Sequence, residues 1–200
     1  MKAATILFCE MTPPAQRIQD IGALIPASGV PGLHSVRSYI GPESHYLFVY
    51  EIDSAFADAA RDRVLQSDSA TGFIGACDAY TELCTTGDAH PSAIDTPLIY
   101  TTRFNVPEDW LAEFDAWCER ELAPILLQCP QWRAIRLFAL ATTGAGQFNR
   151  LAVHYLDDLQ AFDSPMRAAS RATPWRGRLA AQSWFNAHSI LYTAREPRRQ

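Results

Sequence analysis

The chain has 200 residues, of which 48% are hydrophobic and 20% charged, and its formal net charge is −5 at pH 7. This is the composition of an ordinary globular protein with enough apolar side chains for a buried core. A negative net charge does not attract the phosphate backbone of a nucleic acid, so we expect no nucleic-acid partner.

The cysteines are odd in number and include no CxxC pair; they are Cys9, Cys77, Cys84, Cys118 and Cys129. We therefore expect neither a disulfide framework nor a structural zinc site, and no metal at the functional site. The apolar run in "MKAATILFCEM" is too short for a membrane span or a signal segment. These observations predict a cytoplasmic protein with reduced thiols and no membrane association.

The first half of the chain predicts the order strand, helix, strand, strand, helix, strand. The expected strands are 4–11, 33–40, 45–52 and 78–85, and the expected helices are 14–26 and 54–67. The segment "TGDAHPSAIDTP", rich in small residues, Asp and Pro, then predicts a linker.

The second half predicts the same order. The expected strands are 97–104, 132–140, 149–156 and 182–193, and the expected helices are 107–127 and 158–170. The first helix has the clearest signals, since Asn105 can cap it, Pro107 suits its first turn and its apolar residues recur at helical spacing.

Short stretches of the two halves also correspond. "GLHSVRSYI" (32–40) and "QWRAIRLFA" (131–139) share a small residue, a β-branched residue and an arginine in that order. "FVYEIDSAFAD" (48–58) and "AVHYLDDLQAFD" (152–163) are both strand-like runs that enter a helix-like segment after an aspartate. The correspondence predicts an internal repeat and aligns Tyr50 with His154.

A β-α-β-β-α-β order is typical of the ferredoxin-like unit, whose helices cover one face of its sheet. The other face must also be covered. We predict an α+β fold of two tandem ferredoxin-like halves whose antiparallel sheets pack into an α/β barrel. The expected boundaries are 1–88 for the first half, 89–96 for the linker and 97–195 for the second half, which carries most of the pocket. The barrel could close within one chain or between the chains of a homodimer.

The second half resembles the dimeric α/β-barrel proteins, including their EthD-like and stress-responsive relatives. The resemblance rests on "EFDAWCERELAPILL" (113–127), "PQWRAIR" (130–136), "VHYL" (153–156) and "SPMRAASRATPWR" (164–176). In this chain Leu122 and Cys118 stand where such proteins often have histidine and tyrosine. The resemblance implies a fold and a pocket without one reaction, because the superfamily hosts monooxygenases, isomerases, lyases, hydrolases and haem enzymes.

Strand alternation then selects candidate site residues. We expect polar and aromatic side chains to face the space between the two sheets, with Trp175 and Arg176 closing one end. The predicted catalytic residues are His154, His188 and Tyr50, and the predicted substrate-binding residues are Arg136, Arg37, Trp184, Tyr192, Trp175 and Arg176. Histidine can exchange protons near neutral pH, arginine binds carboxylates, and tyrosine or tryptophan can donate to a developing oxyanion.

Structural roles stay open for the same residues. A strand histidine can serve only as a hydrogen-bonded structural residue, and Arg136 or Arg37 can pair with an acid across a sheet. Trp175 and Arg176 can act in closing the fold.

The expected function is a cofactor-free enzyme that acts on a small carboxylated carbonyl compound, such as an aromatic ring-cleavage product, ester or lactone. The reaction would be hydrolysis, as by an esterase or lactonase, or proton-transfer isomerisation, with a histidine base. The alternatives are a haem-binding barrel with His154 or His188 as axial ligand, a non-enzymatic ligand-binding or stress-response protein, and a cofactor-free monooxygenase.

Overall fold

The computed structural model describes residues 4–12, 29–66, 74–88, 95–141 and 148–195. The strands are β1 (Thr5–Met11), β2 (Leu33–Ile40), β3 (Tyr46–Ile52), β4 (Ile74–Gly87), β5 (Leu98–Phe104), β6 (Trp132–Leu140), β7 (Arg150–Leu156) and β8 (His188–Ala194). The α-helices are α1 (Ala57–Gln66), α2 (Leu111–Trp117), α3 (Ala123–Leu126), α4 (Pro165–Arg171) and α5 (Pro174–Ala180). Short 3-10 turns lie at Pro42–Ser44, Ser54–Phe56, Glu108–Trp110 and Leu159–Asp163, and a π-helical turn lies at Cys118–Leu122.

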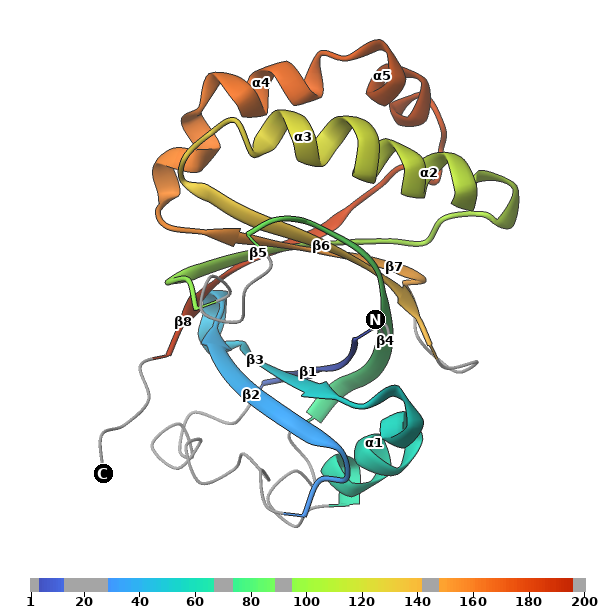
Figure 1. The fold of residues 1–200 in the computed structure, drawn as a ribbon, viewed down its shortest axis with the longest axis vertical. Helices are drawn as coiled ribbons and strands as arrows, with labels where there is room; N and C mark the ends of the chain where they lie inside the picture. Colours follow the sequence, from blue (N-terminus) through green and yellow to red (C-terminus); the bar gives the residue numbers. More distant parts are fainter. Residues whose placement is uncertain (1–3, 13–28, 67–73, 89–94, 142–147, 196–200) are drawn as a thin grey trace. The chain divides into compact units, whose positions relative to one another are not determined.

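The fold is α+β, and hydrogen bonds link the strands in the closed order β1-β3-β2-β8-β5-β7-β6-β4 (Figure 1). The α+β class is confirmed, whereas the division into two tandem halves stays a prediction. The chain forms two compact units, which are described separately. The first comprises Met1–Glu82, Leu140–Gly146 and Tyr192–Gln200, and the second comprises Leu83–Ala139 and Gln147–Leu191.

Several predicted elements differ from the observed ones. The helix expected at 14–26 lies outside the described residues. The helix expected at 107–127 is a succession of a 3-10 turn, α2, the π-helical turn and α3. The strand expected from residue 182 begins only at His188. Before it comes α5, which the sequence reading missed although Thr173 caps its N-terminus by accepting from the Arg176 backbone N–H at 3.3 Å.

In the first unit, β1 pairs antiparallel with β3 and β4, and β2 pairs antiparallel with β3 and β8. One face of this sheet packs against α1, where Leu7 and Tyr50 are buried with Ala60 and Val64. The apolar alternation of β1 and β3 produces this face, because every second side chain points the same way.

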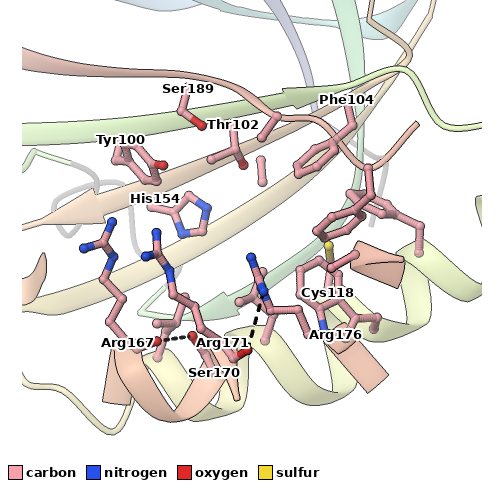
Figure 2. Close-up of a pocket in the computed structure, with 18 of the residues that line it drawn as sticks. Tyr100, Thr102, Phe104, Cys118, His154, Arg167, Ser170, Arg171, Arg176 and Ser189 are labelled. Atoms are coloured by element: carbon pink, nitrogen blue, oxygen red, sulfur yellow. Dashed lines mark hydrogen bonds between the residues drawn. The ribbon is translucent and has the colours of Figure 1, made fainter. Parts of the chain in front are cut away.

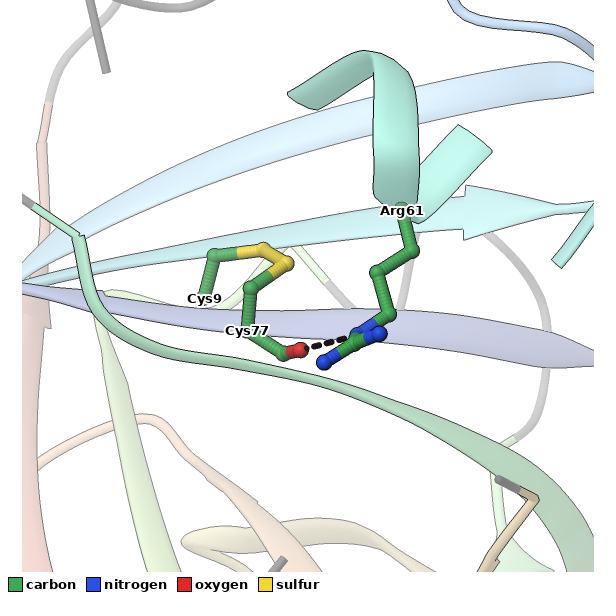
Figure 3. The surroundings of a disulfide bond; sticks show 3 residues. All are labelled: Cys9, Arg61 and Cys77. Carbon is green, nitrogen blue, oxygen red and sulfur yellow. Dashed lines mark hydrogen bonds between the residues drawn. A yellow bond between two sulfur atoms is a disulfide. The ribbon is translucent and has the colours of Figure 1, made fainter. Parts of the chain in front are cut away.

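Cys9 and Cys77 form a disulfide between facing positions of β1 and β4 (Figure 3). Arg61 of α1 covers the same place, and its Nε donates to the Cys77 carbonyl oxygen at 2.7 Å. The expectation that all thiols are reduced is therefore wrong. An odd number of cysteines still allows one pair, and two residues distant in the chain become neighbours when their strands pair.

In the second unit, β7 is the middle strand and pairs antiparallel with β5 and β6. Figure 1 shows α2, α3, α4 and α5 over one face of this sheet, which we call the helix face. The register places Tyr100, Thr102, Ala152 and His154 on the helix face, because Tyr100 pairs with His154 and Thr102 with Ala152.

A register shift between Trp132 and Ala134 changes the alternation of β6. Trp132 is paired with Leu156, and Ile135 is paired with His154. The Trp132 and Ile135 side chains therefore both lie on the helix face of the sheet. Arg136 faces Val153 and lies on the opposite face. The bulge therefore separates Trp132 from Arg136, which simple alternation would place together.

An ion pair joins α2 to β7. The Arg150 Nε and Nη2 donate to the two Asp115 carboxylate oxygens at 2.7 and 2.9 Å. The Arg150 side chain is only 11% exposed. This bidentate geometry holds the helix at a defined place over the sheet.

Candidate functional site

A cavity of about 300 Å³ lies between the sheet and the helices of the second unit (Figure 2). This volume is at the lower end of the range for small-molecule sites. The polar or reactive lining side chains are Tyr100, Thr102, Cys118, Trp132, His154, Arg167, Ser170, Arg171, Arg176 and Ser189. The apolar lining is Phe104, Phe114, Trp117, Leu122, Leu126, Ala152, Ala180, Phe185 and Ala187.

His154 lies on the sheet wall of the cavity and is 3% exposed. The Trp132 indole Nε1–H donates to its Nδ1 at 3.3 Å. Because an indole nitrogen can only donate, Nδ1 must be the acceptor and the proton of the neutral ring is on Nε2. Burial lowers the pKa of His154 to about 3, so the ring is neutral at physiological pH. His154 can therefore offer an Nε2–H donor, but its Nδ1 lone pair is already engaged.

Three arginines line the helix side of the cavity. Arg167 and Arg171 are one turn apart on α4, and Arg176 belongs to α5 (Figure 2). Burial, followed by the nearby Arg171 charge, lowers the pKa of both Arg167 and Arg176. The guanidinium group keeps its charge despite such shifts, so this wall is cationic.

The remaining wall is aromatic. Phe114, Trp117 and Phe185 contact one another with ring centroids 5.7 to 6.5 Å apart. Cys118 lines the cavity beside them, and burial, with a smaller contribution from Asp115, raises the pKa of its thiol. The thiol is thus neutral and is a poor nucleophile.

Two of the predicted site residues, His154 and Arg176, line this cavity. Trp175 packs beside it in the apolar cluster of α2 and α5. The cavity lies on the helix face of one sheet, so the expectation that His154 faces a space between two sheets is wrong. Alternation identifies the residues that share a face, but it does not tell which face the helices cover.

Three other predicted residues of the second unit are not among the residues that line the cavity. Arg136 is on the opposite face of β6, with its guanidinium carbon 4.9 Å from the Phe138 ring centroid. His188 is hydrogen-bonded through Nδ1 to Arg103 Nη2 at 2.9 Å. Trp184 is not on a strand, and its ring lies against Trp110 with centroids 5.8 Å apart. The predicted grouping of these three residues with His154 is therefore wrong.

The last three predicted residues belong to the first unit. Tyr192 is buried and donates through its hydroxyl to Glu10 at 3.0 Å. Tyr50 is buried against α1, and this burial raises the pKa of its phenol. Arg37 faces Val49 in β3. None of the three is among the residues that line the cavity of the second unit.

The sequence reading missed Tyr100, Trp132, Arg167, Ser170 and Arg171 as cavity residues. The sequence did contain a signal for a cationic wall, because residues 164–195 include several arginines but no Asp or Glu to pair with them. Arg167 and Arg171 are also spaced four apart, which places them on one helix face. In the part of the chain that the structure describes, no cluster of three His, Cys, Asp or Glu side chains could hold a metal, and no helix is long and apolar enough to cross a membrane.

No protein-family model matches the sequence, and no curated protein matches it. Solved structures share the fold. An anthrone oxidase-like protein is 16% identical with a TM-score of 0.66, covering 98% of this chain and 92% of that chain. A ferredoxin-fold protein from Listeria monocytogenes, related to antibiotic biosynthesis monooxygenases, is 13% identical with a TM-score of 0.55, covering 98% and 97%.

A chlorite dismutase from Candidatus Nitrospira defluvii, solved with imidazole, is 10% identical with a TM-score of 0.62 and covers 96% of this chain and 91% of its own. At these identities the likeness is one of fold alone. It supports the ferredoxin-like prediction and does not show a relation to EthD-like proteins.

Proposed function

We propose that the protein is a cofactor-free monooxygenase that uses O₂ to oxidise an electron-rich, acidic aromatic compound. The observation that carries the proposal is the cavity itself, where a neutral imidazole donor and an aromatic wall face three arginines. The monooxygenase-related and anthrone oxidase-like neighbours support this reaction class as an analogy of fold.

The proposed chemistry begins with a phenol or enolisable ketone whose anion is a good electron donor. The cationic wall favours the ionised substrate and lowers its pKa, while His154 Nε2–H hydrogen-bonds to its oxygen. The acidic proton, which is the O–H proton of a phenol or the C–H proton next to a ketone carbonyl, leaves to solvent. The carbanion then transfers an electron to O₂, and the resulting pair combines to form a C–O bond.

The peroxide anion formed in this way takes up a proton from solvent. Loss of water from the resulting hydroperoxide breaks its O–O bond and leaves a carbonyl. For an activated methylene the balance is CH₂ + O₂ → C=O + H₂O, in which carbon loses four electrons and O₂ gains four. His154 and the cavity arginines stabilise and orient the substrate anion, whereas the substrate itself supplies the electrons.

Hydrolysis or isomerisation with a His154 base is not supported. A base needs a free lone pair, and Trp132 already donates to Nδ1 while Nε2 holds the proton. The low pKa of the ring also disfavours its protonation.

The residues do not fit haem ligation either. A neutral histidine that binds iron through Nε2 carries its proton on Nδ1 and donates it to an acceptor. In this protein Nδ1 of His154 accepts a hydrogen bond from Trp132, and Nδ1 of His188 accepts one from Arg103. Neither Nδ1 therefore carries the proton that such a ligand would donate. We expect haemin added to the pure protein to produce no Soret shift.

The test is oxygen uptake in the presence of anthrones and quinols that carry acidic groups, with ¹⁸O₂ labelling of the product. We expect one ¹⁸O atom in the new carbonyl and a 10- to 1,000-fold loss of turnover in His154→Leu, as for removal of an oxyanion donor. Arg178→Met is the matched control, because Arg178 lies on α5 but pairs with Glu113 at the surface. Binding of these compounds without oxygen uptake would instead support the alternative of a non-enzymatic ligand-binding protein.

A further inference from the structure

Two of the three cavity arginines are held at separate places. Arg167 donates to the Phe162 carbonyl oxygen at 3.0 Å, and its guanidinium carbon lies 4.7 Å from the Phe162 ring centroid. Arg176 donates to the Arg171 carbonyl oxygen at 3.4 Å and lies 5.8 Å from the Phe185 ring centroid. Each contact fixes a guanidinium group and leaves some of its five N–H donors available.

The two fixed guanidinium groups lie at different ends of the cavity wall. Figure 2 shows Arg167 on the side of Tyr100 and His154, and Arg176 on the side of Phe104 and Cys118. Arg171 lies between them. The two groups therefore offer cationic donors at separate places along the cavity wall.

Within the part of the chain that the structure describes, these three charges have no carboxylate partner at ion-pair distance. Among the described residues, no carboxylate oxygen lies within 4.0 Å of the three guanidinium groups. The charge of Asp163 raises the pKa of Arg167 from beyond ion-pair distance. Asp115 is bound by Arg150, and Glu121 accepts from Trp117 at 3.1 Å and Thr173 at 2.6 Å.

We propose that the substrate carries two ionised groups on one aromatic skeleton, one bound by Arg167 with Arg171 and the other by Arg176. This inference rests on the proposed function only in using the same cavity. A dianion leaves one positive charge on the wall, whereas a monoanion leaves two close together. The aromatic wall formed by Phe114, Trp117 and Phe185 then stacks on the skeleton between the acidic groups.

The test is calorimetric binding of 2-naphthoate and a panel of naphthalene dicarboxylates at pH 7.5 and low salt. These probes are inert towards O₂. We expect at least one dicarboxylate to bind 10- to 100-fold more tightly than 2-naphthoate, because each charge-assisted contact adds about this factor. High salt should reduce the preference.

Arg176→Met should abolish the preference and change the affinity for 2-naphthoate less than threefold. Arg176→Lys keeps the charge and should retain part of the preference, whereas Arg178→Met should retain all of it. A circular dichroism spectrum equal to the wild type establishes that each variant is folded. The proposal is overturned if no dicarboxylate binds, if none binds more than threefold better than 2-naphthoate, or if Arg176→Met weakens both classes equally.

The two proposals fail separately. A dicarboxylate preference without oxygen uptake keeps this inference and removes the monooxygenase. Oxygen uptake without a preference removes only the claim of two acidic groups.

Discussion

Trp132 Nε1 lies 3.3 Å from His154 Nδ1, and both side chains are buried in the second unit. This contact selects one tautomer of the ring, with the proton on Nε2. We expect long-range ¹H–¹⁵N spectra to show a single Nε2–H form in the wild type. Trp132→Phe removes the donor and should give a mixture of both tautomers. A wild-type spectrum with the proton on Nδ1 would contradict the donor role of His154.

Buried His154 should make stability depend on pH. Its pKa is about 3 in the folded chain and near 6.5 when exposed, so between these values the unfolded chain binds a proton that the folded chain does not. The free energy of unfolding therefore falls as pH drops through 6.5, by about 2 kcal/mol between pH 8 and pH 5. Urea unfolding at several pH values should show this fall in the wild type.

His154→Gln should remove that part of the slope, because glutamine does not titrate. His34→Gln is the control, since the His34 side chain is 60% exposed. Equal slopes in the wild type and His154→Gln would show that the ring is not desolvated.

Two ion pairs of α2 should differ in their contribution to stability. Asp115→Asn leaves the nearly buried Arg150 without its bidentate partner and should lower the free energy of unfolding by about 2–3 kcal/mol. Glu113→Gln breaks only the exposed pair with Arg178 and should cost less than about 1 kcal/mol. Urea unfolding measures both, and a larger loss in Glu113→Gln would refute the assignment.

The Cys9–Cys77 disulfide predicts the number of free thiols. The chain has five cysteines, and Cys84, Cys118 and Cys129 are free. Thiol titration of denatured protein purified without reductant should find three thiols per chain, rising to five after reduction. Reduction should lower the free energy of unfolding by up to about 4 kcal/mol, because the bond closes a long loop. A Cys9→Ala/Cys77→Ala double variant should show three thiols under both conditions.

Local patterns predicted much of the fold. The bounds of β6 were confirmed, and β2 was predicted over the observed residues, because alternating apolar residues define a strand over a few positions. The start of β8 was predicted too early because residues 182–187 continue its alternating pattern without pairing. The preceding helix α5 was missed altogether. Pro174 after the capping Thr173 was the signal for a helix start.

The site was harder to predict than the fold. His154 was found from its place in a strand, but its partners depend on tertiary structure. The bulge between Trp132 and Ala134 has no sequence signature, and it moves the indole to the face of His154. The disulfide was hidden for a similar reason, since β1 and β4 become neighbours only in the folded sheet.

The π-helical turn Cys118–Leu122 holds one residue more than an α-helical turn would need. Each residue of an α-helix rotates the following side chains by about 100°. Removing one residue here would turn Leu126 away from the cavity and leave the sheet with His154 unchanged. A single codon insertion or deletion would thus reshape the helix wall of the cavity, while the sheet wall that carries His154 is inherited intact.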